Sequence, residues 1–345
     1  MDEDNVVVVM PPQRKWGLRQ LTAEEYEFWE EHGYVAVARC VPPEVCAAAA
    51  SAIREFVGAS SDRDISWYQN ELDIYEDWIG GKRPKHGPCG MVQMFHHASL
   101  WEIRQHPSVH GAFADVYGTP ELWVTTDRAH FKPPEDPRFP KWANAGPVHT
   151  GLHWDVAVEE KALPVPFAAQ GVLYLEKTNA DQGALRVVPG SRHRLRELRD
   201  RRERLGSLAF DSVAVEGDAG TLVLWHSATL HGPGRNVGSA PRVSAYVAML
   251  PVDATAFNGG RRADYPLSLA DAGTLRYDDD GDAARTLRRV DCEGRVRRWR
   301  RRLPHLEEDP REQEVERYPP GEPAGAPPFG GLTPLGRKLV GLDPW

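Results

Sequence analysis

Residues 221–250 decide the fold, and they read TLVLWHSATLHGPGRNVGSAPRVSAYVAML. The stretch opens with a short apolar run at 221–225 and closes with a longer one at 242–250, and both runs contain β-branched and aromatic residues. Glycine, proline and asparagine separate the two runs, with no helical pattern between them. Two strands joined in this way are typical of antiparallel β-structure and disfavour a doubly wound parallel sheet.

The same alternation of short apolar runs and turn residues extends over residues 121–252. It predicts further strands at 122–132, 152–158, 170–175 and 184–188, interrupted by an arginine-rich helix at 192–205. Nearer the N-terminus, the pattern predicts helices at 22–32, 42–57 and 100–117, and a strand at 34–37. The sequence therefore predicts a mainly β fold, a double-stranded β-helix (jelly roll), with flanking N-terminal helices.

Length and composition indicate one globular domain in 345 residues. We expect a mainly helical part at 1–120, the jelly-roll core at 121–252 and a C-terminal extension at 253–345. The net charge of −8 disfavours nucleic-acid binding. The arginine-rich stretches at 192–204 and 285–302 also contain acidic residues, so exposed ion pairs account for their many arginines without a bound nucleic acid.

The expected location of the protein is the cytoplasm. No apolar run approaches the roughly 20 residues of a membrane helix, and the four cysteines form no Cys-x-x-Cys pair. We therefore expect a small-molecule substrate, with neither nucleic acid nor membrane as a partner. Nothing in the sequence selects an oligomeric state.

A His-x-Asp motif stands at His153 and Asp155. On a strand, residues two apart point to the same face, so the two side chains can hold one metal ion while Trp154 points away. Such a motif often arises by chance, and it gains weight from a third ligand, His231, which we place at the end of an apolar strand. Two histidines and one carboxylate form the facial triad associated with non-haem Fe(II) oxygenases.

Arg242 and Ser244 share one face of the predicted strand at 242–250. A guanidinium and a hydroxyl placed together suit a carboxylate, because the arginine can pair with both carboxylate oxygens and the serine can donate a further hydrogen bond. A dicarboxylate that chelates iron at one end needs such an anchor at the other.

These motifs resemble those of the phytanoyl-CoA dioxygenase family of iron- and 2-oxoglutarate-dependent oxygenases. After the His-x-Asp motif, residues 181–193 (DQGALRVVPGSRH) are similar to the glycine-rich family element, and His231 precedes Arg242 by the family's eleven positions. The Lys-Pro-Pro at 132–134 matches a further element. Gln182 replaces the usual asparagine, and Pro233 stands where the family often has serine or threonine.

The resemblance implies an Fe(II)- and 2-oxoglutarate-dependent dioxygenase that uses O2 to hydroxylate an unactivated C–H bond of a small organic substrate, with release of succinate and CO2. It assigns roles to His153, Asp155 and His231 at the metal, and to Arg242, Ser244 and Lys132 at the co-substrate. Related halogenases carry a small residue in place of the carboxylate ligand, so Asp155 favours hydroxylation.

Two other classes of function remain open from the sequence. A jelly-roll metalloenzyme without oxygen chemistry, such as a hydrolase or isomerase, would not need Arg242 and Ser244. A non-enzymatic metal- or ligand-binding protein on the same fold would tolerate loss of a ligand. Among the neighbours, His149 has the strand parity of His153, so two interpretations stay open for it: an alternative ligand, or a residue that contacts the ligands. His226 is predicted to be a packed or hydrogen-bonded histidine.

Overall fold

The computed structural model describes residues 16–59, 64–68, 90–92, 94, 97–125, 127–142, 151–156, 158, 165, 167–205, 210–252, 331–340 and 343–345. Its helices are α1 (Ala23–His32), α2 (Pro43–Val57), α4 (Ala98–Arg104), α5 (Pro107–Tyr117), α6 (Leu195–Leu205) and α11 (Pro334–Val340), with 3₁₀ helices η2 (Asp64–Tyr68), η4 (Pro140–Trp142) and η6 (Ser191–Arg194). Its strands are β1 (Tyr34–Val37), β2 (Met91–Val92), β3 (Leu122–Val124), β4 (Ala129–Lys132), β5 (Ala169–Tyr174), β6 (Leu185–Val187), β7 (Val213–Val215), β8 (Leu222–His226), β9 (His231–Pro233) and β10 (Arg242–Pro251).

The first two helices begin within one residue of the predicted start and end at the predicted residue. At the start of α1, the Thr22 hydroxyl accepts a hydrogen bond from the Glu25 N–H, and the Glu25 carboxylate accepts one from the Thr22 N–H. The helix ends at Gly33, whose φ of 74° is in the left-handed region that favours glycine. Helix α2 has Pro43 at its first position. Proline lacks a backbone N–H, and an N–H at this position would have no partner within the helix, so nothing is lost there.

The single helix predicted at 100–117 is wrong, because the structure has two helices, α4 and α5. The break falls at His106, immediately before Pro107. A proline ring disfavours the helical conformation of the residue before it, and proline has no N–H to continue the helical hydrogen bonding. The His106 side chain instead caps α5 by accepting a hydrogen bond from the Ser108 N–H.

Two predicted strands also require correction. The strand predicted at 122–132 is divided into β3 and β4. The described residues of the segment predicted at 152–158 form an isolated bridge, between His153 and His231, in place of a strand. Strands β2, β7 and β9 were not predicted. Each has two or three residues, which is too short for an alternating pattern to show in the sequence.

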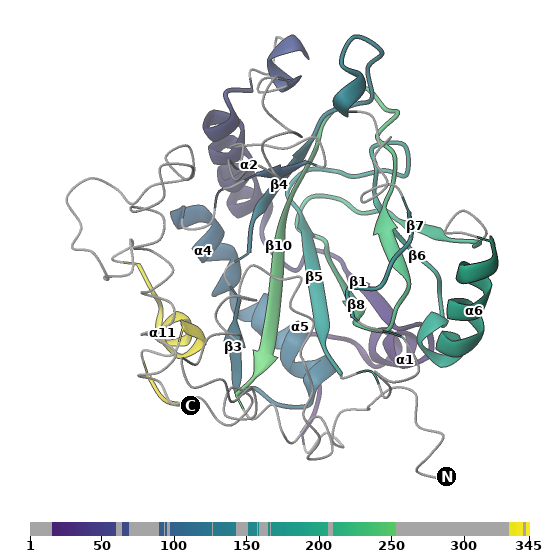
Figure 1. The fold of residues 1–345 in the computed structure, drawn as a ribbon. Coiled ribbons are helices and arrows are strands. Elements are labelled where there is room, and N and C mark those ends of the chain that lie inside the picture. Colours follow the sequence, from purple (N-terminus) through teal and green to yellow (C-terminus); the bar gives the residue numbers. More distant parts are fainter. Residues whose placement is uncertain are drawn as a thin grey trace, which may run out of the picture.

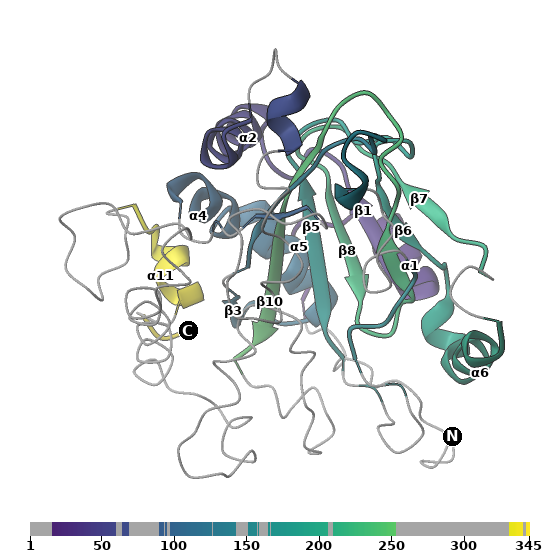
Figure 2. The same cartoon turned by 45° about the horizontal axis from the view of Figure 1, so that its top comes forward.

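The strands form two antiparallel sheets in the described part of the chain. The large sheet has the order β1-β8-β5-β10-β4-β2, with β3 also paired to β10, and the small sheet has the order β7-β6-β9. Figure 1 shows the central strands β10, β5 and β8 side by side, and Figure 2 shows β6 and β7 on the side of the large sheet away from α2 and α4. This arrangement confirms the predicted double-stranded β-helix with N-terminal helices.

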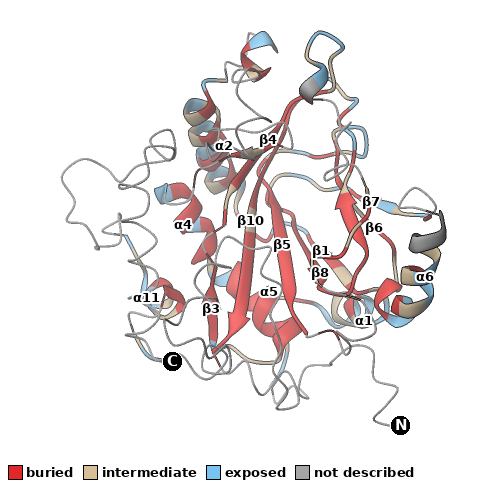
Figure 3. Cartoon of the chain, in the orientation of Figure 1, coloured by how far each residue is buried: buried red, intermediate tan, exposed pale blue. Residues whose placement is uncertain are grey.

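Strand β10 shows how the large sheet separates two layers. Val243, Ala245, Val247 and Met249 face the helical layer and belong to its apolar core. On the other face, side chains of the large sheet meet those of the small sheet in a second apolar cluster, which contains Val172, Tyr174, Val223 and Trp225 with Leu185, Val187 and Val215. The central strands are therefore buried on both faces (Figure 3). Arg242, by its parity on β10, lies on the face between the sheets.

Most of the predicted C-terminal extension, including the arginine-rich stretch at 285–302, lies outside the described residues. Its described part packs beside β3 and the helical layer, where Gln105 donates a hydrogen bond to the Gly331 carbonyl and accepts one from the Thr333 N–H. The Trp345 ring stacks on that of His110, with the ring centroids 5.4 Å apart. Among the described helices, we find none with the length and apolar character needed to cross a lipid bilayer.

Candidate metal centre

The structure brings His153, Asp155 and His231 together. The His153 Nε2 atom lies 3.4 Å from Asp155 Oδ1, and the His231 Nε2 atom lies 3.3 Å from Asp155 Oδ2. The ligand atoms of the three side chains all lie within 4.8 Å of one another, which is close enough to hold one metal ion. The predicted position of His231 at a strand end is wrong, because His231 begins β9 and the strand before it ends at His226.

Backbone carbonyls orient both imidazoles. The Nδ1 atom of His153 lies 3.2 Å from the Gly151 carbonyl oxygen, and that of His231 lies 2.9 Å from the Thr229 carbonyl oxygen. Because a carbonyl can only accept a hydrogen bond, each Nδ1 carries a proton and donates it. Each Nε2 is then available as a metal ligand, which is the arrangement that outer partners impose on metal-binding histidines.

Asp155 supplies a negative charge to this group. Burial would raise the pKa of its carboxyl, but the hydrogen bonds and charges of His153 and His231 outweigh burial and hold the pKa well below its usual range. The carboxylate is therefore ionised at neutral pH. Two imidazole nitrogens and one carboxylate fit Fe(II), because this donor set occupies three positions and leaves the others open.

The turn between β8 and β9 carries His231, and each of its residues is tied to a different element. The Ala228 N–H donates to His226 Nδ1 at 2.9 Å, the Thr229 hydroxyl donates to the Gly33 carbonyl at 2.7 Å, and the Leu230 N–H donates to a serine hydroxyl of η6 at 2.9 Å. The Thr229 carbonyl orients His231. It is held in place because Thr229 and its two chain neighbours, Ala228 and Leu230, each make a hydrogen bond that involves a side chain. His226 is packed and hydrogen-bonded, as the sequence predicts.

Acidification is expected to destabilise the metal-free protein partly through His226. Burial, with the nearby charge of Arg192 as a smaller cause, holds the pKa of His226 well below its ordinary value of 6.5. Below pH 6.5 the unfolded chain binds a proton that the folded state excludes, so this stability is complete above that pH and is lost as the pH falls. His226→Asn keeps an acceptor for the Ala228 N–H and cannot titrate.

The measurement is the urea midpoint of metal-free protein between pH 7.5 and 5.5. The wild-type midpoint should fall with pH, and His226→Asn should show a smaller fall. The pKa values of His97, His106 and His110 are also lowered by burial, so part of the wild-type dependence should remain in the variant. Equal pH dependence in the two proteins would contradict this explanation.

Arg242 is a buried cation between the two sheets. Its side chain is 2% exposed, and its Nη1 donates to the Gly183 carbonyl at 2.7 Å. Among the described residues, its Nε has no hydrogen-bond partner and its guanidinium pairs with no acidic side chain. Gly183 has a φ of 83°, and a Cβ there would lie 2.9 Å from the Gly234 carbonyl oxygen, so this close approach requires glycine.

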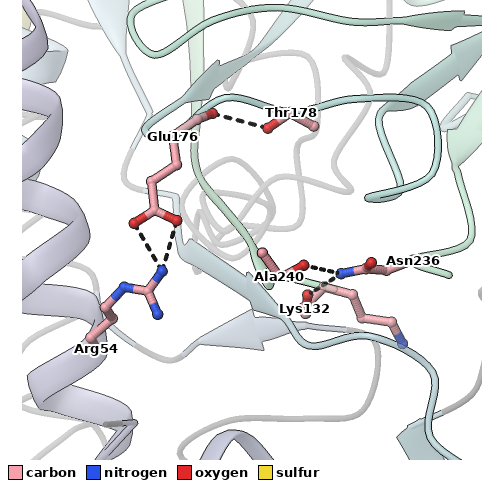
Figure 4. A network of polar contacts seen from close by, with 6 residues as sticks. All are labelled: Arg54, Lys132, Glu176, Thr178, Asn236 and Ala240. Atoms are coloured by element: carbon pink, nitrogen blue, oxygen red, sulfur yellow. Dashed lines mark hydrogen bonds and ion pairs between the residues drawn. The ribbon is translucent and has the colours of Figure 1, made fainter. Parts of the chain in front are cut away.

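Ser244 and Lys132 lie near Arg242 in the strand register. Ser244 is fully buried, and its hydroxyl has no hydrogen-bond partner among the described residues. Lys132 lies directly opposite Arg242 on β4, and its Nζ donates to the Trp142 carbonyl at 2.7 Å. Asn236 fixes this corner, because its amide donates to the backbone carbonyls of Lys132 and Ala240 (Figure 4).

Sequence reasoning missed Gln170 on β5. Its amide Nε2 donates to Asp155 Oδ2 at 2.8 Å, and no motif or spacing in the sequence relates the two residues. Of the neighbouring residues considered from the sequence, His149 lies outside the described residues. Tyr246, which shares the parity of Arg242, lies half-buried on the inner face and contacts the His130 ring edge-to-face at 5.8 Å.

Comparison with known proteins places the chain in a family. The model of the phytanoyl-CoA dioxygenase (PhyH) family matches residues 29–244, which is more than half of the chain. A search of curated proteins found no relative. The chain is similar to the solved structure of the epimerase SnoN in complex with Fe3+, alpha ketoglutarate and nogalamycin RO, with 16% sequence identity, coverage of 67% of this chain and 83% of that chain, and a TM-score of 0.46. It is also similar to the structure of EctD from S. alaskensis with 2-oxoglutarate and 5-hydroxyectoine, with 18% sequence identity, coverage of 71% of this chain and 83% of that chain, and a TM-score of 0.46.

These structural likenesses are distant. The match over residues 29–244 includes all three candidate metal ligands, Arg242 and Ser244. The ligand geometry within that match fits the metal that the family uses. The chain belongs to the phytanoyl-CoA dioxygenase family and is an Fe(II)- and 2-oxoglutarate-dependent dioxygenase.

Proposed function

We propose that the protein hydroxylates an unactivated C–H bond of a small organic substrate. With Fe(II) and 2-oxoglutarate bound, O2 is reduced, 2-oxoglutarate is converted into succinate and CO2, and one oxygen atom enters the substrate. The observation that carries the proposal is the pairing of the triad with a buried guanidinium that has no acidic partner in the described structure. This combination suits a dicarboxylate held at both ends.

His153, Asp155 and His231 are the proposed metal ligands. Asp155 binds as a carboxylate without first losing a proton, because its pKa lies well below neutral pH. The two imidazoles bind through Nε2, since their Nδ1 protons are donated to backbone carbonyls. Metal binding through the two Nε2 atoms requires both atoms to be free of protons, and the ionised carboxylate adds the negative charge that a divalent cation needs.

Arg242 and Ser244 are the proposed anchor for the far carboxylate of 2-oxoglutarate. Arg242 Nε and Ser244 Oγ are buried donors without partners in the described structure, and a carboxylate would satisfy both. Lys132, the cross-strand neighbour of Arg242, adds positive charge to the same corner while its amine holds the Trp142 carbonyl. The apolar cluster between the sheets keeps water from these groups and strengthens their attraction for an anion.

The test is turnover of 2-oxoglutarate by the purified protein. We expect slow formation of succinate when Fe(II), ascorbate and 2-oxoglutarate are supplied in air, even without the true substrate. Removal of O2, or addition of a metal chelator, should stop it. Screening small molecules for faster succinate release would then identify the substrate class.

The alternative functions give different results in this assay. A hydrolase or isomerase on this fold would bind metal without consuming 2-oxoglutarate, and a binding protein would do the same without turning over any compound. Absence of succinate from a protein that is folded and loaded with Fe(II), across the whole screen, would contradict the proposed hydroxylation.

A further inference from the structure

We propose that Gln170 is a positioning residue for Asp155, and that its amide fixes the plane in which the carboxylate meets the metal ion. This inference rests on the proposed function only in assuming that the triad binds a divalent metal. Gln170 is 5% exposed, and its Nε2 donates to Asp155 Oδ2 at 2.8 Å, which is shorter than the 3.3–3.4 Å contacts of that carboxylate with His231 and His153.

The carboxylate needs such a contact because its terminal torsion is soft. Rotation about the bond between an aspartate Cβ and its carboxylate has broad, nearly two-fold preferences. His153 and His231 each lie near a different oxygen of Asp155. A metal ion bound by both histidines would occupy their Nε2 lone pairs, so these contacts would no longer hold the carboxylate, whereas the Gln170 amide still could.

The contact also distinguishes the two oxygens of Asp155. Oδ2 accepts the Gln170 hydrogen bond, whereas Oδ1 has no contact with that amide. An oxygen that already accepts a charge-assisted hydrogen bond is a weaker ligand than its partner. Gln170 therefore favours binding through one oxygen and opposes chelation of the ion by both, which keeps coordination positions open for the co-substrate and O2.

Gln170 can do this because the large sheet holds it rigidly. It lies in β5 between β8 and β10, directly opposite Trp225 on β8. The Trp225 ring in turn lies 5.0 Å from the His231 ring. Gln170 and Trp225, which are cross-strand neighbours, thus contact Asp155 and His231, two of the three proposed ligands, without being ligands themselves.

The test is Co(II) titration of the metal-free protein, followed by the visible d–d absorption of the bound ion. Gln170→Met has nearly the same shape but no N–H to donate. We expect its Kd for Co(II) to rise roughly 10- to 100-fold, as is typical when outer-shell partners are lost. The shape of the d–d bands should also change, because the carboxylate can turn. The KM for 2-oxoglutarate at saturating metal should stay near the wild-type value.

The matched control is Gln105→Met, which removes another buried amide, one that holds the Gly331 and Thr333 backbone far from the triad in sequence. It should leave the Co(II) affinity and spectrum unchanged. If Gln170→Met does not fold, Gln170→Asn keeps the amide but is one methylene too short to reach, and it should change the spectrum in the same direction.

A folded Gln170 variant with wild-type Co(II) affinity and spectrum would overturn the inference, even if its melting temperature falls. Its failure is distinguishable from failure of the proposed function. If Gln170→Met weakens Co(II) binding but the wild-type protein forms no succinate, the proposed function is contradicted and the role of Gln170 stands. If the wild-type protein forms succinate but the Gln170 variants bind Co(II) as wild type does, the role of Gln170 is contradicted and the proposed function stands.

Discussion

Asp155→Ala is expected to abolish succinate formation. Asp155 is the anionic ligand of the proposed triad, and its oxygens lie 3.3–3.4 Å from the Nε2 atoms of both histidines. Without it, two neutral imidazoles remain, and we expect the loss of metal affinity to exceed the roughly 10- to 100-fold loss typical of an outer-shell change. The measurements are the Co(II) titration and the rate of succinate release at saturating 2-oxoglutarate.

Two further variants separate loss of the ligand from loss of the fold. Asp155→Asn keeps the shape and one oxygen but removes the charge, so it should retain more metal affinity than Asp155→Ala. Asp200→Ala removes an exposed carboxylate of α6 that pairs with Arg199, and it should behave as wild type. Full turnover by folded Asp155→Ala would remove Asp155 from the metal site.

The fold class could be predicted because the long strands carry their burial pattern in the sequence. In β10, the apolar residues at 243, 245, 247 and 249 alternate with Arg242 and Ser244, and this alternation predicts which face each side chain takes. The capping box of α1 is likewise a local signal within four residues. Local patterns of this kind do not depend on the rest of the chain.

The errors occur where distant contacts or very short elements decide the structure. In the described part of the chain, the segment around His153 forms no strand of its own, and its ladder partner His231 lies almost eighty residues away in the sequence. Strand β9 contains glycine and proline and is held by pairing with β6. Neither feature has a hydrophobic period that a sequence pattern could show.

The site was predictable to a similar depth. The ligand types and their spacing indicate the triad and the anchor, because motif positions carry that information. The supporting groups act through backbone or through packing across the sheet. Thr229 and Gly183 use their carbonyl oxygens, which every residue has, and Gln170 meets Asp155 only after β5 is placed beside the small sheet. Such partners become visible in the structure alone.

Arg242→Ala is expected to raise the KM for 2-oxoglutarate strongly while Co(II) affinity stays near wild type. Hydrogen bonds to charged groups contribute roughly 1.5–3 kcal/mol each, so loss of one such bond corresponds to about a 10- to 100-fold rise in KM. Arg242→Lys keeps the charge but loses the planar fork, and its KM should lie between the two. The measurement is the dependence of succinate release on 2-oxoglutarate concentration.

Arg54→Ala is the matched control for Arg242→Ala. Arg54 pairs with Glu176 at 2.7 Å (Figure 4), and its guanidinium lies over the Phe131 ring. Phe131 belongs to the helical layer, on the face of β4 opposite to Lys132. Arg54→Ala should therefore lower stability without changing the KM. An unchanged KM in folded Arg242→Ala would show that the buried guanidinium serves the packing of the Gly183 turn, and the co-substrate anchor would have to be sought elsewhere in the site.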